Sequence, residues 1–121
     1  MKNVKSCEDL DVWKLAVDLT TDIYANLKTL NDYGLRYQMQ RSAVSVPSNI
    51  AEGFERQTNK EFIHFLYIAK GSCSELRTQL HIISKLEYLA EDICTQLINQ
   101  TLSISKMLNA LIQYRKTFVK G

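Results

Sequence analysis

The sequence predicts an all-α fold, an antiparallel up-down-up-down four-helix bundle, on two observations. The 121 residues include only four glycines and one proline, and chains with so few helix-breaking residues are usually helical. Apolar residues recur at steps of three and four in four stretches, and the short connections between them make sequential helices antiparallel. We expect helices at about 10–30, 35–53, 59–86 and 91–114, in a single domain that spans residues 1–121.

The first stretch, about 10–30, has an apolar face and an opposite polar face. The apolar face carries Trp13, Ala16, Val17, Thr20, Ile23, Tyr24, Leu27 and Leu30. Lys14, Asp18, Thr21, Asp22 and Lys28 lie on the polar face. Asn31-Asp32-Tyr33-Gly34 follows, and these residue types are typical of a turn.

The second stretch, about 35–53, contains the one proline of the chain. Met39, Ala43, Val46 and Ile50 keep one apolar face through Pro47, so the helix is predicted to continue past it and to kink there. Proline has no N–H to donate to the carbonyl of Ala43. The candidates to satisfy this carbonyl are the nearby Ser42, Ser45 and Ser48. Gly53 is predicted to end the helix in the left-handed conformation.

The third and fourth stretches complete the bundle. Thr58 and Glu61 form a predicted capping box that starts the third helix. Its core seam is Phe62, Leu66, Ala69, Cys73, Leu76, Leu80 and Ile83, the spacing of a bundle helix. The fourth helix is marked by Ile93, Leu97, Ile104, Leu108 and Leu111. Gly71 interrupts the third helix, and we expect it to allow close approach of the second helix.

Composition excludes several classes of protein. The three cysteines are far apart without a C-x-x-C pair, which gives a disulfide framework or a zinc site little support, so Cys73 and Cys94 are interpreted as small core residues. The chain has neither a signal peptide nor an apolar run of roughly 18 residues, so we expect a cytoplasmic protein without a membrane span. The net charge of +2 does not by itself indicate nucleic-acid binding.

Catalytic motifs find little support. Glu61 and His64 have the spacing of a di-iron bundle ligand pair, but a second such pair is missing and Glu61 already has a capping role. A glycine-rich phosphate loop and a nucleophile motif with a recognisable base are also missing. We therefore expect a protein that is not an enzyme and that uses no metal and no cofactor.

Several motifs of the chain are specific in combination. They are Leu10-Asp11-Val12-Trp13-Lys14-Leu15-Ala16, then Gln38, Arg41 and the run Ser42 to Gly53, then Glu61-Phe62 and the run Ala69 to Leu76. Together they resemble the motifs of a known family, the four-helix-bundle proteins encoded in intervening sequences of bacterial 23S ribosomal RNA genes. The resemblance covers nearly the whole chain. It implies an antiparallel four-helix bundle that assembles as a homo-oligomer, with a pentamer favoured. It also implies similarity to the accessory proteins of diversity-generating retroelements, which partner a reverse transcriptase and bind nucleic acid.

A polar line runs along the second helix beside its apolar face. Its members, spaced three or four apart, are Gln38, Arg41, Ser45, Asn49 and Glu52. One interpretation is an internal network with Glu75 and Gln79 of the third helix, which fixes the register around Pro47. The other is a binding groove.

A basic line follows the third helix on the side away from its core seam. It consists of Lys60, His64, Tyr67, Lys70, Ser74, Arg77, His81 and Lys85, without an acidic residue between them. Basic side chains with an aromatic ring among them are typical of contact with a phosphate backbone, and Tyr67 could stack on a base. The alternative is an ordinary solvated helix face.

Extra apolar residues lie beside the core faces and favour self-association. They are Phe65, Ile68, Ile82 and Leu86 on the third helix and Val12, Leu15 and Leu19 on the first. The alternative is a wide core stripe on a central helix. The function predicted is a non-enzymatic oligomer that binds RNA, DNA or a nucleic-acid-processing partner, such as a reverse-transcriptase-like protein. The alternative function is a protein scaffold that binds no nucleic acid.

Overall fold

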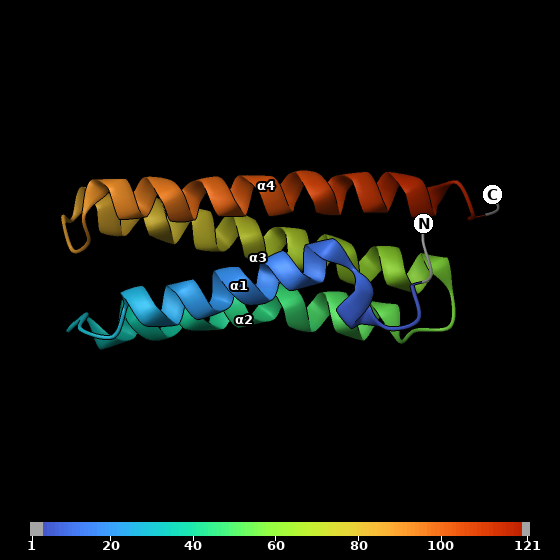
Figure 1. Cartoon of the computed structure of the whole chain (residues 1–121), viewed down its shortest axis with the longest axis horizontal. Coiled ribbons are helices and arrows are strands. Elements are labelled where there is room, and N and C mark those ends of the chain that lie inside the picture. The colour runs from blue at the N-terminus through green and yellow to red at the C-terminus, as the bar shows by residue number, and fades with distance from the viewer. Residues whose placement is uncertain (1–3, 120–121) are drawn as a thin grey trace.

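The computed structural model describes residues 4–119, which form a bundle of four long helices after one short 3-10 turn, η1 (Cys7–Asp9). The helices are α1 (Asp11–Asn26), α2 (Tyr33–Phe54), α3 (Asn59–Lys85) and α4 (Glu91–Lys116). Successive helices run back and forth along one axis, with the α1–α2 and α3–α4 connections at one end and the α2–α3 connection at the other (Figure 1). The predicted all-α four-helix bundle is confirmed.

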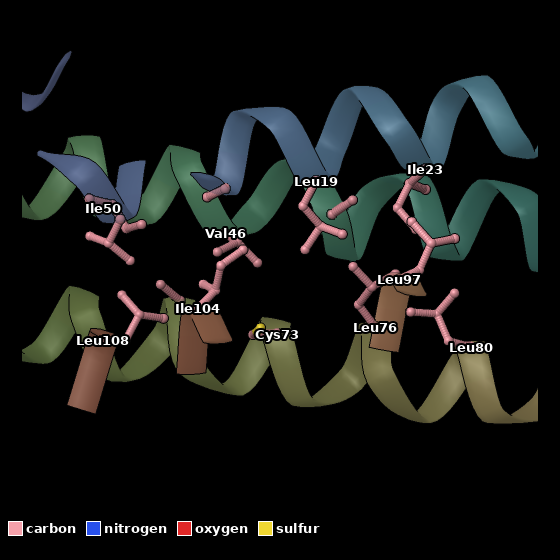
Figure 2. Packing of buried hydrophobic residues seen from close by; sticks show 14 of the residues in the cluster. Leu19, Ile23, Val46, Ile50, Cys73, Leu76, Leu80, Leu97, Ile104 and Leu108 are labelled. Atoms are coloured by element: carbon pink, nitrogen blue, oxygen red, sulfur yellow. The ribbon is translucent and has the colours of Figure 1, made fainter. Parts of the chain in front are cut away.

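Each helix packs against two neighbours around a shared core. The contacts run from α1 to α2, α2 to α3, α3 to α4 and α4 back to α1, and the contact of α2 with α3 is the most extensive. Leu19, Ile23, Val46 and Ile50 face Leu76, Leu97 and Leu108 across the core (Figure 2). The seam predicted on the third helix, including Cys73, is buried throughout. Burial of apolar surface on all four helices is the main stabilising term.

The end of the first helix and the cap of the third helix differ from the prediction. The first helix ends at Asn26 and not near Leu30, because the backbone at Leu27 leaves the helical conformation while its side chain stays in the core. At the start of α3, the Glu61 amide donates to the Thr58 hydroxyl at 3.1 Å, as expected of a capping box. The Glu61 carboxylate, however, accepts from the Thr58 hydroxyl, also at 3.1 Å, and not from the Thr58 amide.

The helix α2 continues through Pro47, and the carbonyl that the proline leaves without a partner is satisfied from another helix. Thr20 of α1 places its hydroxyl oxygen 3.0 Å from the carbonyl oxygen of Ala43 and 2.8 Å from that of Ala16. One hydroxyl proton is shared between the two acceptors. The expectation that Ser42, Ser45 or Ser48 would fill this role is wrong, because the Ser42 and Ser45 hydroxyls bond toward α3.

We therefore expect Thr20→Val to destabilise the bundle by about 1–3 kcal/mol, the cost of leaving a buried carbonyl unpaired. Pro47→Ala restores an amide that can donate to Ala43, so Thr20→Val should cost less in that background. Chemical denaturation of the two single variants and the double variant measures this coupling. Equal costs of Thr20→Val in both backgrounds would contradict a role for Thr20 at the proline.

Gly53 and Gly71 do not have the roles predicted for them. A Cβ atom built on Gly53 falls 2.7 Å from Phe65 Cβ and 2.9 Å from Phe62 Cδ1, so the close approach of α2 and α3 occurs here. Gly53 lies within the helix, and the left-handed stop expected there is wrong. A Cβ on Gly71 meets nothing within 4 Å, so the predicted packing of α2 on Gly71 is also wrong.

Candidate nucleic-acid interface

The basic line of the third helix forms one side of α3 and borders α4. We call it the basic face: Lys60, His64, Tyr67, Lys70, Arg77, His81 and Lys85, which are exposed or half-buried. The helical spacing of three and four residues places them on one side of α3, because the opposite side is occupied by the core seam. Whether this face binds nucleic acid stays a prediction.

Polar residues of α4 hold the middle of the basic face in place. Lys70 Nζ donates to Asn109 Oδ1 at 3.3 Å, and Arg77 donates to Ser105 Oγ at 3.5 Å. Arg77 also donates to Ser74 Oγ at 3.2 Å, so its guanidinium is oriented by both helices. These neutral partners position the cations without cancelling their charge.

A further cation from α4 joins the basic face near its Lys60 end. Lys116 Nζ lies 5.4 Å from the centre of the Tyr67 ring, within the range of a cation–π contact. Lys116 was not predicted to join this face, although the turn between α3 and α4 places the end of α4 opposite the start of α3. Tyr67 is nevertheless 44% exposed and available for stacking.

The charge on the basic face is not compensated by nearby carboxylates. Within residues 4–119 the one ion pair is Arg56 with Glu52, at 3.7 Å on the surface. Lys60, Lys70, Arg77, Lys85 and Lys116 therefore carry positive charge that no described carboxylate neutralises at contact distance. Such a cluster attracts a polyanion more strongly than the net charge of the chain suggests.

The extra apolar residues divide between core and surface. Val12 and Leu19 are buried in the core, so they were wrongly expected to lie on an outer flank, whereas Leu15 is 41% exposed. Phe65 is half-buried, with the Arg56 guanidinium 4.8 Å from its ring centre. Ile68, Ile82 and Leu86 remain exposed on α3, and we call these three residues the apolar strip.

The polar line of α2 makes only part of the predicted network. Ser45 Oγ lies 2.8 Å from Ser72 Oγ of α3, and Asn49 Nδ2 donates to the carbonyl and the hydroxyl of Ser45 at 2.8 and 2.9 Å. Arg41 and Glu52 do not take part: Glu52 pairs with Arg56, and Arg41 makes no hydrogen bond or ion pair with any residue in 4–119.

Beside this line, α2 and α3 enclose a groove of about 560 Å³, the serine groove. Its lining comprises Gly34, Tyr37, Gln38, Arg41, Ser42, Ser45, Ser72, Glu75 and Gln79. The polar line is therefore in part a hydrogen-bonded ridge, and this ridge forms the wall of a groove. Whether the groove binds a ligand stays a prediction.

The thiols are placed for packing. The Cys73 thiol donates to the carbonyl of Thr101 at 3.2 Å, and burial raises the pKa of Cys73 and of Cys94. Burial and the hydrogen bond to Glu8 raise the pKa of Cys7 to about 11. A raised pKa keeps each thiol protonated at neutral pH. Among residues 4–119, no three His, Cys, Asp or Glu side chains gather as a metal site requires, and no helix is long and apolar enough to cross a membrane.

Comparison with known proteins decides the family. The family model for 23S rRNA-intervening sequence proteins matches residues 8–110, which is most of the chain. The chain belongs to this family. No curated protein matches the chain.

The bundle of this 23S rRNA-intervening sequence protein is similar to a solved structure. That structure is a protein of unknown function from the S23 ribosomal protein family of Bacteroides thetaiotaomicron. The two chains are 25% identical, with a TM-score of 0.79, over 84% of this chain and 97% of the other. The predicted resemblance to the 23S rRNA-intervening sequence family is thus confirmed, whereas the similarity to retroelement accessory proteins stays a prediction.

Proposed function

We propose that this 23S rRNA-intervening sequence protein is a non-enzymatic protein that binds RNA or DNA through the basic face of α3. The observation that carries the proposal is the set of cations from Lys60 to Lys85, joined by Lys116, without a paired carboxylate in the described part of the chain. The exposed ring of Tyr67 adds a stacking surface among these cations.

The expected binding is largely independent of sequence and sensitive to salt. Cations that neutralise phosphates release counterions, so the observed affinity falls steeply as salt concentration rises. A gel-shift titration of a short single-stranded RNA and its DNA equivalent, repeated over a series of salt concentrations, measures this slope. Absence of binding at low salt, or binding that does not weaken with salt, would refute the proposal.

The apolar strip favours self-association as a second property. Ile68, Ile82 and Leu86 are 38%, 43% and 48% exposed on one side of α3, where a single chain leaves them in water. Burying such a strip against a second copy is favourable. We propose a homo-oligomer, with the pentamer of the family resemblance as the expected size. It would repeat the basic face around the assembly and raise the local potential.

A scaffold that binds proteins through the same strip is the competing function. Light scattering of the wild type and of an Ile68→Ser/Ile82→Ser variant tests whether the strip is used for self-association or for binding another protein. A wild-type mass equal to one chain would reject self-association. Partner binding without any retention of nucleic acid would favour the scaffold.

A further inference from the structure

The serine groove contains a buried polar group without a partner. Gln79 is 7% exposed, and its side-chain oxygen Oε1 is buried without a hydrogen bond to any described residue. Buried amide oxygens are nearly always paired, so such an atom at the wall of an open groove indicates a missing donor. Gln79 lines this groove, so a ligand there could supply the donor.

The neighbouring side chains define the chemistry of that ligand. Glu75 accepts from the Ser42 hydroxyl at 2.8 Å, and its carboxylate retains further acceptor capacity. With Gln79 Oε1 it offers two acceptors along one helix, four residues apart. Two adjacent acceptors are complementary to a ligand edge that carries two donors, such as two neighbouring N–H groups of a planar ring.

The α2 wall adds an aromatic ring and a cation. Tyr37 lines the groove and is 61% exposed, and Arg41 lines it one helical turn further on. A tyrosine ring stacks on planar groups, and a guanidinium binds phosphate. Acceptors for an amino edge, a ring for stacking and a cation for a phosphate are the complement of a nucleotide.

We propose that the serine groove binds a nucleobase with an exocyclic amino group, and guanine above the others. Guanine presents a ring N–H and an amino group side by side, matching the acceptors Glu75 and Gln79. Uracil presents one N–H between two carbonyl oxygens, which would face these acceptors unfavourably. The inference rests on the proposed function, because a nucleic-acid strand held on the basic face would supply the base. The groove itself lies on the other flank of α3.

Free nucleoside monophosphates test the groove without involving the basic face. In NMR titrations of the full chain with GMP, AMP, CMP and UMP, we expect the Gln79 side-chain amide signals to shift most with GMP and least with UMP. Guanosine should bind more weakly than GMP because it lacks the phosphate for Arg41. Equal shifts with all four nucleotides, or none, would overturn the inference.

Gln79→Met separates recognition from folding. Methionine has a similar shape and no unpaired oxygen, so the variant should be at least as stable as the wild type, while its affinity for GMP falls about tenfold or more. The matched control is Gln100→Met, because Gln100 also has a buried unpaired Oε1 but lines the groove between α1 and α4. The control should bind GMP normally.

The remaining outcomes are equally decisive. Unchanged GMP binding by Gln79→Met would refute the site. If no nucleotide binds and Gln79→Met alters the mass measured by light scattering, the groove is occupied by a second copy and the inference fails. Binding of an oligonucleotide by the basic face is measured separately. Its absence would refute the proposed function, whereas the nucleotide titration alone tests the groove.

Discussion

Reversing two charges on the basic face, Lys70→Glu with Arg77→Glu, is expected to weaken nucleic-acid binding by on the order of a hundredfold at low salt. Both cations lie in the middle of the face and are held by Asn109 and Ser105 of α4. Each lost phosphate contact should lower the salt slope by about one, and each new carboxylate adds repulsion. Fluorescence anisotropy with a labelled single strand, over several salt concentrations, measures both effects.

Two controls separate charge from structure in this experiment. Lys70→Gln with Arg77→Gln keeps side chains that can bond to α4, so it should fold normally and show a smaller loss of affinity. The control variant, Lys14→Glu in α1 with Lys28→Glu in the turn that follows α1, makes the same change in net charge on exposed positions away from α3. If this control loses as much affinity as the α3 variant, the basic face is not the binding site.

Gly53→Ala is expected to destabilise the bundle by about 1–3 kcal/mol, although alanine favours helix by about 1 kcal/mol over glycine. The new Cβ would lie 2.7 Å from Phe65 Cβ and 3.2 Å from the carbonyl oxygen of Phe62. Neither atom can rotate away, because one is fixed to the α3 backbone and the other belongs to it. Helices α2 and α3 would have to move apart. Thermal unfolding should show a melting temperature lowered by several degrees.

Gly71→Ala is the matched control for this prediction. It is the same substitution within a helix, but a Cβ there meets no atom within 4 Å. The variant should therefore gain up to about 1 kcal/mol from helix propensity. A stabilised Gly53→Ala, or a Gly71→Ala that unfolds at lower temperature, would contradict the assignment of close packing to Gly53.

The elements of the fold were predictable because their causes are local. Apolar periodicity identified the third helix from Phe62 to Ile83, and all seven seam residues are buried. The Thr58 cap was predictable for the same reason, since the residues that form it are three apart. The end of the first helix was not, because tertiary packing retains Leu27 in the core after the helical backbone has ended.

Features that join two helices could not be read from spacing along one helix. The partner of the Ala43 carbonyl is Thr20, 23 residues earlier, which was predicted only as a member of the apolar face. The serine groove likewise depends on how Ser42 and Ser45 meet Ser72 and Glu75 across the α2–α3 contact. Glu75 and Gln79 were considered as partners of the polar line, but the unpaired oxygen of Gln79 appears only in three dimensions.

The sequence by itself determined four amphipathic helices, their antiparallel order and the line of cations on one of them, because periodicity and turn residues act within a few residues. The tertiary structure alone decided which glycine lies at the close contact of two helices, which hydroxyl donates to the carbonyl left unpaired by the proline, and where a groove remains open. These depend on the rotation and separation of packed helices, quantities set by side chains from two elements at once.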